Sequence, residues 1–227
     1  MREAVQYIGW LVGIPLEILI IAALLRGPAK RFPVLLLYMV VLLLATVVQI
    51  PAYTAHFSGR QLAHTRAFYY WWSAAVLQLL VFGVVVSLIH EATAQARHRR
   101  PVRTVLVVGA IVFAAVSFLI HYDGRVVSGA WMTPWSRDIN FVSAILDLAL
   151  WALLIASSHK DRRLLMLTAA LGIQFSGEAI GQALRRISPS VVFTGNVLIL
   201  LVNLACLYIW WQALRAAPVR QQHGVIL

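Results

Sequence analysis

The stretch Gly172-Ile173-Gln174-Phe175-Ser176-Gly177-Glu178-Ala179-Ile180-Gly181-Gln182 lies inside a long apolar run, residues 164–184. A run of this length predicts a membrane-crossing helix, because the hydrocarbon core of a bilayer needs about 20 apolar residues. On that helix Gln174, Glu178 and Gln182 are spaced four residues apart and share one face. A carboxylic acid between two amides at membrane depth is costly to bury without a partner. The stretch therefore predicts a transmembrane helix with a polar face that other helices must surround.

Two glycines beside this polar face predict a close contact with a second helix. Gly177 and Gly181 are four residues apart and lie on the same side of the expected helix. Small residues at this spacing let two helix backbones approach each other closely inside a membrane. We therefore expect a neighbouring helix to pack directly on these glycines.

The composition places the whole chain in the membrane class. Of its 227 residues, 61% are hydrophobic and 12% are charged, whereas soluble domains average about 45–50% and about 25%. The net charge of +11 comes mainly from basic residues in short connections between apolar runs. There they set the orientation of the helices and meet anionic lipid headgroups. We therefore expect the lipid bilayer as partner and no nucleic acid.

Seven apolar runs predict an all-α fold, a bundle of seven transmembrane helices in one integral membrane domain, residues 1–227. The expected helices cover residues 7–25, 32–53, 66–90, 104–121, 138–158, 164–184 and 190–214. The connection 122–137 is the longest, and Gly124, Gly129 and Pro134 interrupt it. We expect Trp131 and Trp135 to lie there at the level of the lipid headgroups.

The distribution of basic residues predicts the orientation of the bundle. Basic residues concentrate in the connections near residues 26–31, 97–103 and 160–163, which lie on one side of the membrane. Positively charged connections stay in the cytoplasm. We therefore predict a multi-pass protein of the cytoplasmic (inner) membrane, with the N-terminus outside and the C-terminus in the cytoplasm. The most basic connection is expected to contact anionic lipid headgroups or an acidic partner through Arg97, Arg99, Arg100 and Arg103.

Three carboxylates lie within the apolar runs, namely Glu17, Asp147 and Glu178, and no lysine or arginine lies at comparable depth. A buried carboxyl group can carry a proton and be neutral, or it can face water and bind a proton, a metal ion or a cationic ligand. The structural alternative is a simple hydrogen bond to a neighbouring helix. Intramembrane ionisable groups mark function often enough to make these three residues candidates.

The predicted orientation places the polar residues of several helices in a cleft that opens outward and has an acidic floor. Glu17, Asp147 and Asn203 fall near the middle of the membrane, whereas Glu178 and Asn196 fall in its outer half. The predicted ion- or ligand-binding residues are Glu17, Gln49, Asp147, Gln174, Glu178, Gln182, Asn196 and Asn203.

Several chemistries lack the residues that they need. The only lysines, Lys30 and Lys160, lie in connections, so no retinal Schiff base is expected. No phosphate-binding loop, nucleophile elbow or histidine pair of a zinc protease is present. The single cysteine, Cys206, excludes an intrachain disulfide. We therefore predict no enzyme activity, no cofactor and no metal site.

Two functions rank ahead of a third, an intramembrane enzyme. The first is a transporter or channel-like protein coupled to a proton or small cation, in which the three carboxylates bind the moving species. The alternative is a seven-helix membrane sensor or subunit that binds a small ligand or a partner helix in the outward-facing cleft. Either function is compatible with a homo-oligomer.

Overall fold

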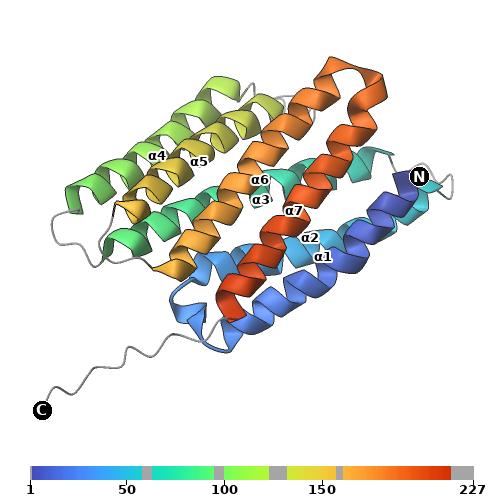
Figure 1. Ribbon diagram of the computed structural model, residues 1–227. Coiled ribbons are helices and arrows are strands. Elements are labelled where there is room, and N and C mark those ends of the chain that lie inside the picture. The colour runs from blue at the N-terminus through green and yellow to red at the C-terminus, as the bar shows by residue number, and fades with distance from the viewer. Residues whose placement is uncertain (1, 58–62, 95–99, 123–131, 157–160, 216–227) are drawn as a thin grey trace, which may run out of the picture.

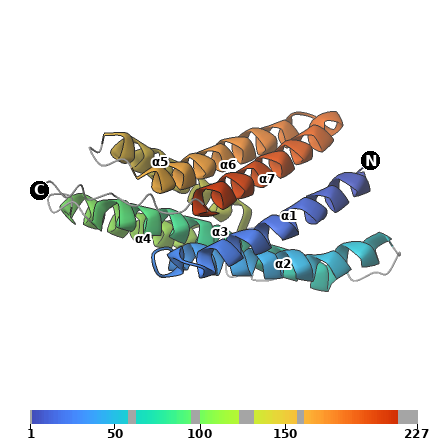
Figure 2. The same cartoon turned by 60° about the horizontal axis from the view of Figure 1, so that its bottom comes forward.

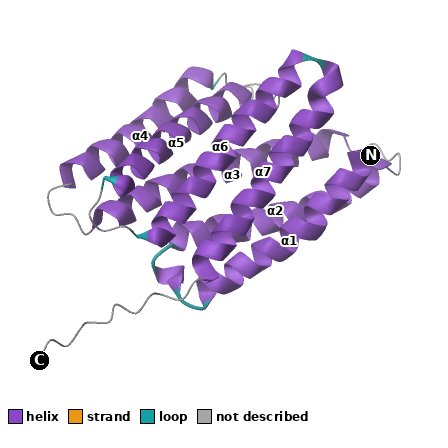
Figure 3. Ribbon diagram, in the orientation of Figure 1, coloured by secondary structure: helices purple, strands orange, loops and turns teal. Residues whose placement is uncertain are grey.

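The computed structural model describes residues 2–57, 63–94, 100–122, 132–156 and 161–215. The described residues form seven α-helices and no strand (Figures 1 and 3). The helices are α1 (Arg2–Leu25), α2 (Pro33–Phe57), α3 (Ala63–Ala94), α4 (Arg100–His121), α5 (Met132–Ile155), α6 (Arg162–Ile187) and α7 (Val192–Arg215). Two single turns of 3-10 helix, Pro28–Lys30 and Pro189–Val191, precede α2 and α7.

Helices that follow each other in sequence pack side by side, and α7 returns to pack on α1. Figure 2 shows α5, α6 and α7 in one layer above α1 to α4. In the lower layer α3 packs against both α2 and α4, and it also contacts α5 and α6 in the upper layer. The core between the layers is apolar and includes the fully buried side chains of Val85, Leu150 and Leu171. The position of α3 therefore lets it contact helices from both halves of the chain.

Six of the described helices contain segments long and apolar enough to cross a membrane. These segments are Tyr7–Leu25, Pro33–Ile50, Ser73–Thr93, Pro134–Ile155, Arg162–Arg185 and Val192–Arg215. The apolar part of α4 that is described, Val107–His121, is shorter. Large apolar side chains such as Leu11, Leu119 and Ile187 are exposed on the outside of the bundle, as lipid contact requires. An all-helical membrane protein is therefore confirmed, whereas the seventh crossing and the orientation stay predictions.

The start of α5 differs from the sequence prediction. The helix begins at Met132, not at residue 138, and Pro134 lies in its first turn. Proline is tolerated there because the first backbone N–H groups of a helix have no partner within it. Trp135 is consequently buried in the bundle, where its ring packs edge-on against Phe118 at 6.0 Å; its position at the level of the lipid headgroups stays a prediction. Trp131, Gly124 and Gly129 lie outside the described residues.

Helices α6 and α7 approach each other through glycines, as the sequence predicted for α6. Gly177 lies directly against Val202, and Gly181 lies against Ile199. A third glycine, Gly195 of α7, completes the contact, because a Cβ atom placed on it would lie 2.7 Å from the carbonyl oxygen of Gly181. The two backbones therefore touch where side chains would keep them apart.

A second glycine pair brings α1 onto the other side of α7. Gly9 and Gly13 are also four residues apart, and they face Leu200 and Leu204 of α7. A Cβ atom on Gly9 would lie 2.8 Å from a methyl group of Leu200. Helix α7 is therefore held between two glycine-bearing helices, and this fixes the position of the polar residues that it carries.

Candidate functional site

Two chains of hydrogen bonds converge on Glu178 of α6. In the first chain, the Gln78 amide of α3 donates to Asn140 Oδ1 of α5 at 2.9 Å, and Asn140 Nδ2 donates to Glu178 Oε2 at 3.4 Å. In the second chain, the Cys206 thiol of α7 donates to Gln174 Oε1 at 3.3 Å, and Gln174 Nε2 donates to Glu178 Oε1 at 3.2 Å. We call these five residues the interior cluster, and they join four helices.

The sequence explains the part of the interior cluster that lies on α6. Gln174 and Glu178 are one helical turn apart, a spacing that brings their side chains together. Gln174 is buried and also has the buried Tyr38 of α2 as a hydrogen-bond partner. The Tyr38 ring packs edge-on against Trp210 of α7 at 5.9 Å, and Trp210 donates its indole N–H to the carbonyl oxygen of Leu167. Tyr38 of α2 and Cys206 of α7 therefore hold the Gln174 amide from two other helices.

Asp147 of α5 lies beside the interior cluster. Its exposed fraction is 3%, and its Oδ1 atom has no hydrogen-bond partner among the described residues. The carboxyl group fits against α6 because Gly172 has no side chain there; a Cβ atom would lie 3.3 Å from Asp147 Oδ2. Cys206 lies within electrostatic range of both Asp147 and Glu178. The second predicted carboxylate is therefore close to the first.

Glu17 of α1 approaches the same region from the other layer. Its exposed fraction is 4%, and the Thr46 hydroxyl of α2 donates to Oε1 at a long 3.4 Å. The Oε2 atom is buried without a partner in the described part of the chain. Tyr38 lies within electrostatic range of both Glu17 and Glu178. Tyr38 is thus near Glu17 and Glu178, and Cys206 is near Asp147 and Glu178; a single site formed by the three predicted carboxylates stays a prediction.

The other predicted site residues are more dispersed. Gln49 of α2 and Asn203 of α7 are half-buried, whereas Gln182 and Asn196 are exposed. The prediction that Gln182 shares the environment of Gln174 is therefore wrong. Eight residues make about 2.2 turns of an α-helix, so the two amides point about 80° apart around the helix axis. The rotation of α6 that buries Gln174 consequently leaves Gln182 exposed.

The predicted ion- or ligand-binding residues did not include three members of the interior cluster, namely Gln78, Asn140 and Cys206. Asn140 offered a signal, because it is seven residues from Asp147 and shares its side of the helix. Gln78 is a polar residue near the middle of an apolar helix, which is also a signal. Cys206 offered none, because a lone cysteine in an apolar run reads as a small buried hydrophobic residue.

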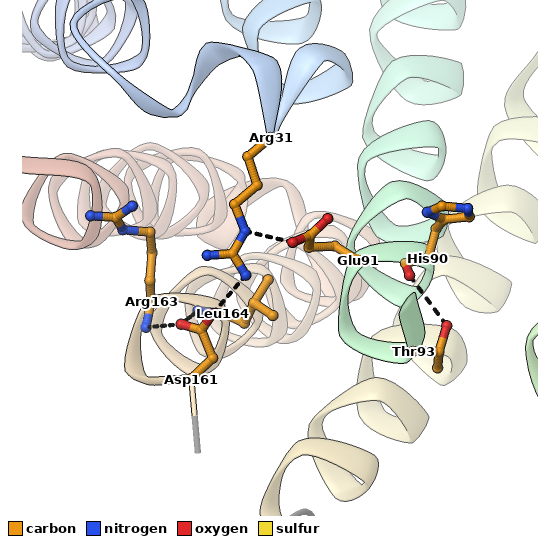
Figure 4. A network of polar contacts seen from close by, with 7 residues as sticks. All are labelled: Arg31, His90, Glu91, Thr93, Asp161, Arg163 and Leu164. Carbon is orange, nitrogen blue, oxygen red and sulfur yellow. Dashed lines mark hydrogen bonds and ion pairs between the residues drawn. The ribbon is translucent and has the colours of Figure 1, made fainter. Parts of the chain in front are cut away.

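A second polar group lies at one end of the bundle, and we call Arg31, Glu91 and Asp161 the end cluster (Figure 4). Arg31 follows the first 3-10 turn, and its Nε atom donates to Glu91 Oε1 of α3 at 2.5 Å. Its terminal NH2 group donates to Asp161 Oδ2 at 2.7 Å. Asp161 also caps α6, because it accepts hydrogen bonds from the backbone N–H groups of Arg163 and Leu164.

The charges of the end cluster stabilise one another. Burial alone would raise the pKa of Asp161, but hydrogen bonds from Arg31 and from the backbone, together with the Arg31 charge, hold it below its usual value. Burial would likewise lower the pKa of Arg31, and Glu91 and Asp161 together raise it. Arg163 adds α7 to this end by donating to the carbonyl oxygen of Ala213 at 3.2 Å. The end cluster therefore fastens α3 and the start of α6 to the α1–α2 connection, and Arg163 joins α7 to the same end.

A third polar group joins α4 to α5. Ser117 donates its hydroxyl to Asp138 Oδ2 at 3.0 Å, and His121 Nδ1 lies 3.8 Å from the same oxygen. His121 Nδ1 also lies 2.9 Å from the carbonyl oxygen of Ser117, to which it is positioned to donate. These contacts satisfy the polar atoms of the two helices locally, and they do not reach the interior cluster.

Two of the four predicted lipid-binding arginines lie in a described helix. Arg97 and Arg99 lie outside the described residues, and Arg100 and Arg103 lie in the first turn of α4. Contact of these four residues with anionic lipid headgroups stays a prediction.

Comparison of the chain with protein-family models, with curated proteins and with solved structures finds no match. Among the described residues, no group of three or more His, Cys, Asp or Glu side chains is placed to hold a metal ion. The chemistry of the interior carboxylates is therefore the best guide to function.

Proposed function

We propose that this multi-pass membrane protein binds a proton or small cation at its interior carboxylates and moves it as a transporter or channel-like protein. One observation carries the proposal: Glu17, Asp147 and Glu178 lie inside helices long and apolar enough to cross a membrane. In the described part of the chain, the ion pairs involve only Arg31, Glu91, Asp161 and the residues around Asp138. None of the three interior carboxylates takes part in these ion pairs.

An ionised carboxylate without a basic partner is costly in an apolar interior. Insertion scales put the cost of an aspartate at the centre of a membrane helix at about 3 kcal/mol. A bound proton or a bound cation removes that cost, and either one can leave again if the site communicates with water. Three such sites lie on α1, α5 and α6. Tyr38 lies near Glu17 and Glu178, and Cys206 lies near Asp147 and Glu178, which supports stepwise movement of the bound species.

In the proposed orientation within the cytoplasmic (inner) membrane, the N-terminus lies outside and the C-terminus lies in the cytoplasm. Helix α4 is then the seventh crossing. The orientation is supported by the end cluster, where the end of α3, the start of α6 and the end of α7 meet near the basic α1–α2 connection. A C-terminal reporter fusion tests the orientation. Reporter activity confined to the outer side would contradict it.

Proton movement is tested in reconstituted vesicles. The purified protein is incorporated, a potassium diffusion potential is imposed with valinomycin, and an internal dye reports pH. Wild-type protein should acidify or alkalinise the lumen according to the sign of the potential. Glu178→Gln should abolish this change, because glutamine keeps a similar shape and hydrogen-bonding capacity but cannot exchange a proton.

The matched control is Asp138→Asn, which neutralises a carboxylate that already has partners at the edge of the bundle. It should retain the flux. The vesicle experiment is repeated with a sodium gradient to detect a small cation in place of a proton. Wild-type flux in Glu178→Gln, Asp147→Asn and Glu17→Gln alike would overturn the proposal and favour the ligand-binding sensor.

A further inference from the structure

The hydrogen bonds of the interior cluster have a common direction, because each one points toward Glu178. The Cys206 thiol donates to Gln174 Oε1, which leaves the NH2 group of Gln174 facing Glu178. The NH2 group of Gln78 donates to Asn140 Oδ1, which leaves the NH2 group of Asn140 facing Glu178. Both carboxyl oxygens therefore accept hydrogen bonds, and this arrangement fits an ionised carboxylate.

A proton on Glu178 changes what the carboxyl group needs. The protonated oxygen becomes a donor and requires an acceptor, but Gln174 and Asn140 both present NH2 groups to it. An amide can supply an acceptor by turning over through 180°, which exchanges its oxygen and its nitrogen. If Asn140 turns over, its NH2 group faces Gln78, and Gln78 must then turn over as well to present its own oxygen.

The amides that can turn over most easily are those of the first hydrogen-bond chain, Gln78 and Asn140. Gln174 is buried and is held by Cys206 and Tyr38 as well as by Glu178. Asn140 is only half-buried, and its 3.4 Å contact with Glu178 is the longest of the four hydrogen bonds. Reversal of the Asn140 amide therefore breaks less than reversal of the Gln174 amide.

We propose that Asn140 and Gln78 are positioning residues for Glu178, whose amides favour the ionised carboxylate and turn over together when Glu178 takes up a proton. Protonation on α6 is thereby transmitted through α5 to α3. The proposal rests on the proposed function in one respect: Glu178 is a site that exchanges a proton.

The surroundings of Glu178 leave this role to the amides. The titratable groups near it on other helices are Tyr38 of α2 and Cys206 of α7. Asp147 of α5 lies near Cys206, and Glu17 of α1 lies near Tyr38. All four are acids, and α3 contributes the neutral Gln78. Neutral donors are therefore the groups that stabilise a negative charge on Glu178.

The test is an infrared pH titration of the full-length protein in lipid nanodiscs. The carbonyl stretch of a protonated carboxyl group is followed, and Glu178→Gln identifies the band of Glu178. Asn140→Leu removes a donor to the charged form, so the midpoint of protonation should move to higher pH by about one unit. Gln78→Leu should move it in the same direction by less, because Asn140 keeps its donor but loses the bond that holds its orientation.

The matched control is Ser143→Ala, which removes a buried hydroxyl one turn from Asn140 that donates to the carbonyl oxygen of Ile139 in its own helix. It should leave the midpoint unchanged. Thermal unfolding identifies variants that fail to fold. If Asn140→Leu fails, Asn140→Asp keeps the shape, replaces a donor by an acceptor and should also move the midpoint upward.

Three results would overturn the inference: a Glu178 band that does not titrate, a midpoint that stays in place in the Asn140 variants, or an equal shift in Gln78→Leu and Ser143→Ala. The vesicle experiment separates this inference from the proposed function. Graded shifts without proton or sodium flux would support the positioning role and contradict transport. Flux with an unmoved midpoint would support transport and contradict the positioning role.

Discussion

The end cluster and the interior cluster stabilise carboxylates with different partners. In the end cluster, one guanidinium group lies between two carboxylates at 2.5 and 2.7 Å, with the three side chains 27–36% exposed. In the interior cluster, one carboxylate is surrounded by amides and a thiol, none of which is charged. In the end cluster the protein pairs charge with charge, which stabilises the ionised forms of Arg31 and Asp161. At Glu178, which is half-buried as well, it uses neutral donors, and amides among them can turn over when the carboxyl group takes up a proton.

The largest loss of stability should come from a substitution that pushes α7 away from α6 and leaves every polar side chain unchanged. In Gly181→Leu the new side chain collides with Ile199 and with the backbone of Gly195, so α6 and α7 must move apart. We expect a loss of about 3 kcal/mol or more in the free energy of unfolding, measured in detergent. Gly109→Leu on α4 is the control, because nothing lies within 4 Å of its Cβ position. Equal stability of the two variants would contradict the close contact.

The next effect concerns Glu178 itself. Glu178→Leu leaves the NH2 groups of Gln174 and Asn140 without their acceptor, which should cost about 1–3 kcal/mol. Glu178→Gln preserves an acceptor and should fold almost normally. Denaturant unfolding of the two variants measures the difference. If both unfold like the wild type, the hydrogen bonds of the interior cluster add nothing to stability.

A smaller effect is expected at the end cluster. Arg31→Met leaves Glu91 and Asp161 beside each other without their cation. Because these groups are partly exposed, water screens the repulsion, and we expect a loss of about 1 kcal/mol. Arg137→Met is the control, since Arg137 is 66% exposed and lies 4.0 Å from Asp138. A loss as large as that of Glu178→Leu would mean that the end cluster is less screened than its exposure indicates.

The smallest effect is the pH dependence of the end cluster. Because the pKa of Asp161 is lower in the folded protein, its contribution is complete above the aspartate's usual pKa of about 3.9 and is lost as pH falls through the lower folded value. Asp161→Asn keeps a good helix cap but removes the charge. This variant should therefore lose less stability than the wild type when the pH is lowered through that range. Thermal unfolding at several acidic pH values measures it, and parallel curves would contradict the role of the charge.

The sequence predicted those features that follow from local pattern. Apolar runs located all seven helices, and the spacing of Gln174 and Glu178 predicted their contact. The partners of Glu178 on α3 and α5 depend on how those helices are rotated in the bundle, which no local pattern records. Arg31 pairs with Glu91 and Asp161 across 60 and 130 residues of sequence. Such contacts follow from the packing of whole helices and could not be read from the residues beside them.

The double role of Asp161 predicts an order of assembly. The cap of α6 needs only Arg163 and Leu164, so it can form as soon as this segment leaves the ribosome. The pair with Arg31 closes a loop of 130 residues, and long loops are closed late because of their entropy cost. Arg31 and Glu91 are synthesised long before Asp161 and can pair first. We therefore expect the Arg31–Asp161 contact to form only when the second half of the chain has begun to insert. A chain interrupted before Asp161 can form only the Arg31–Glu91 contact.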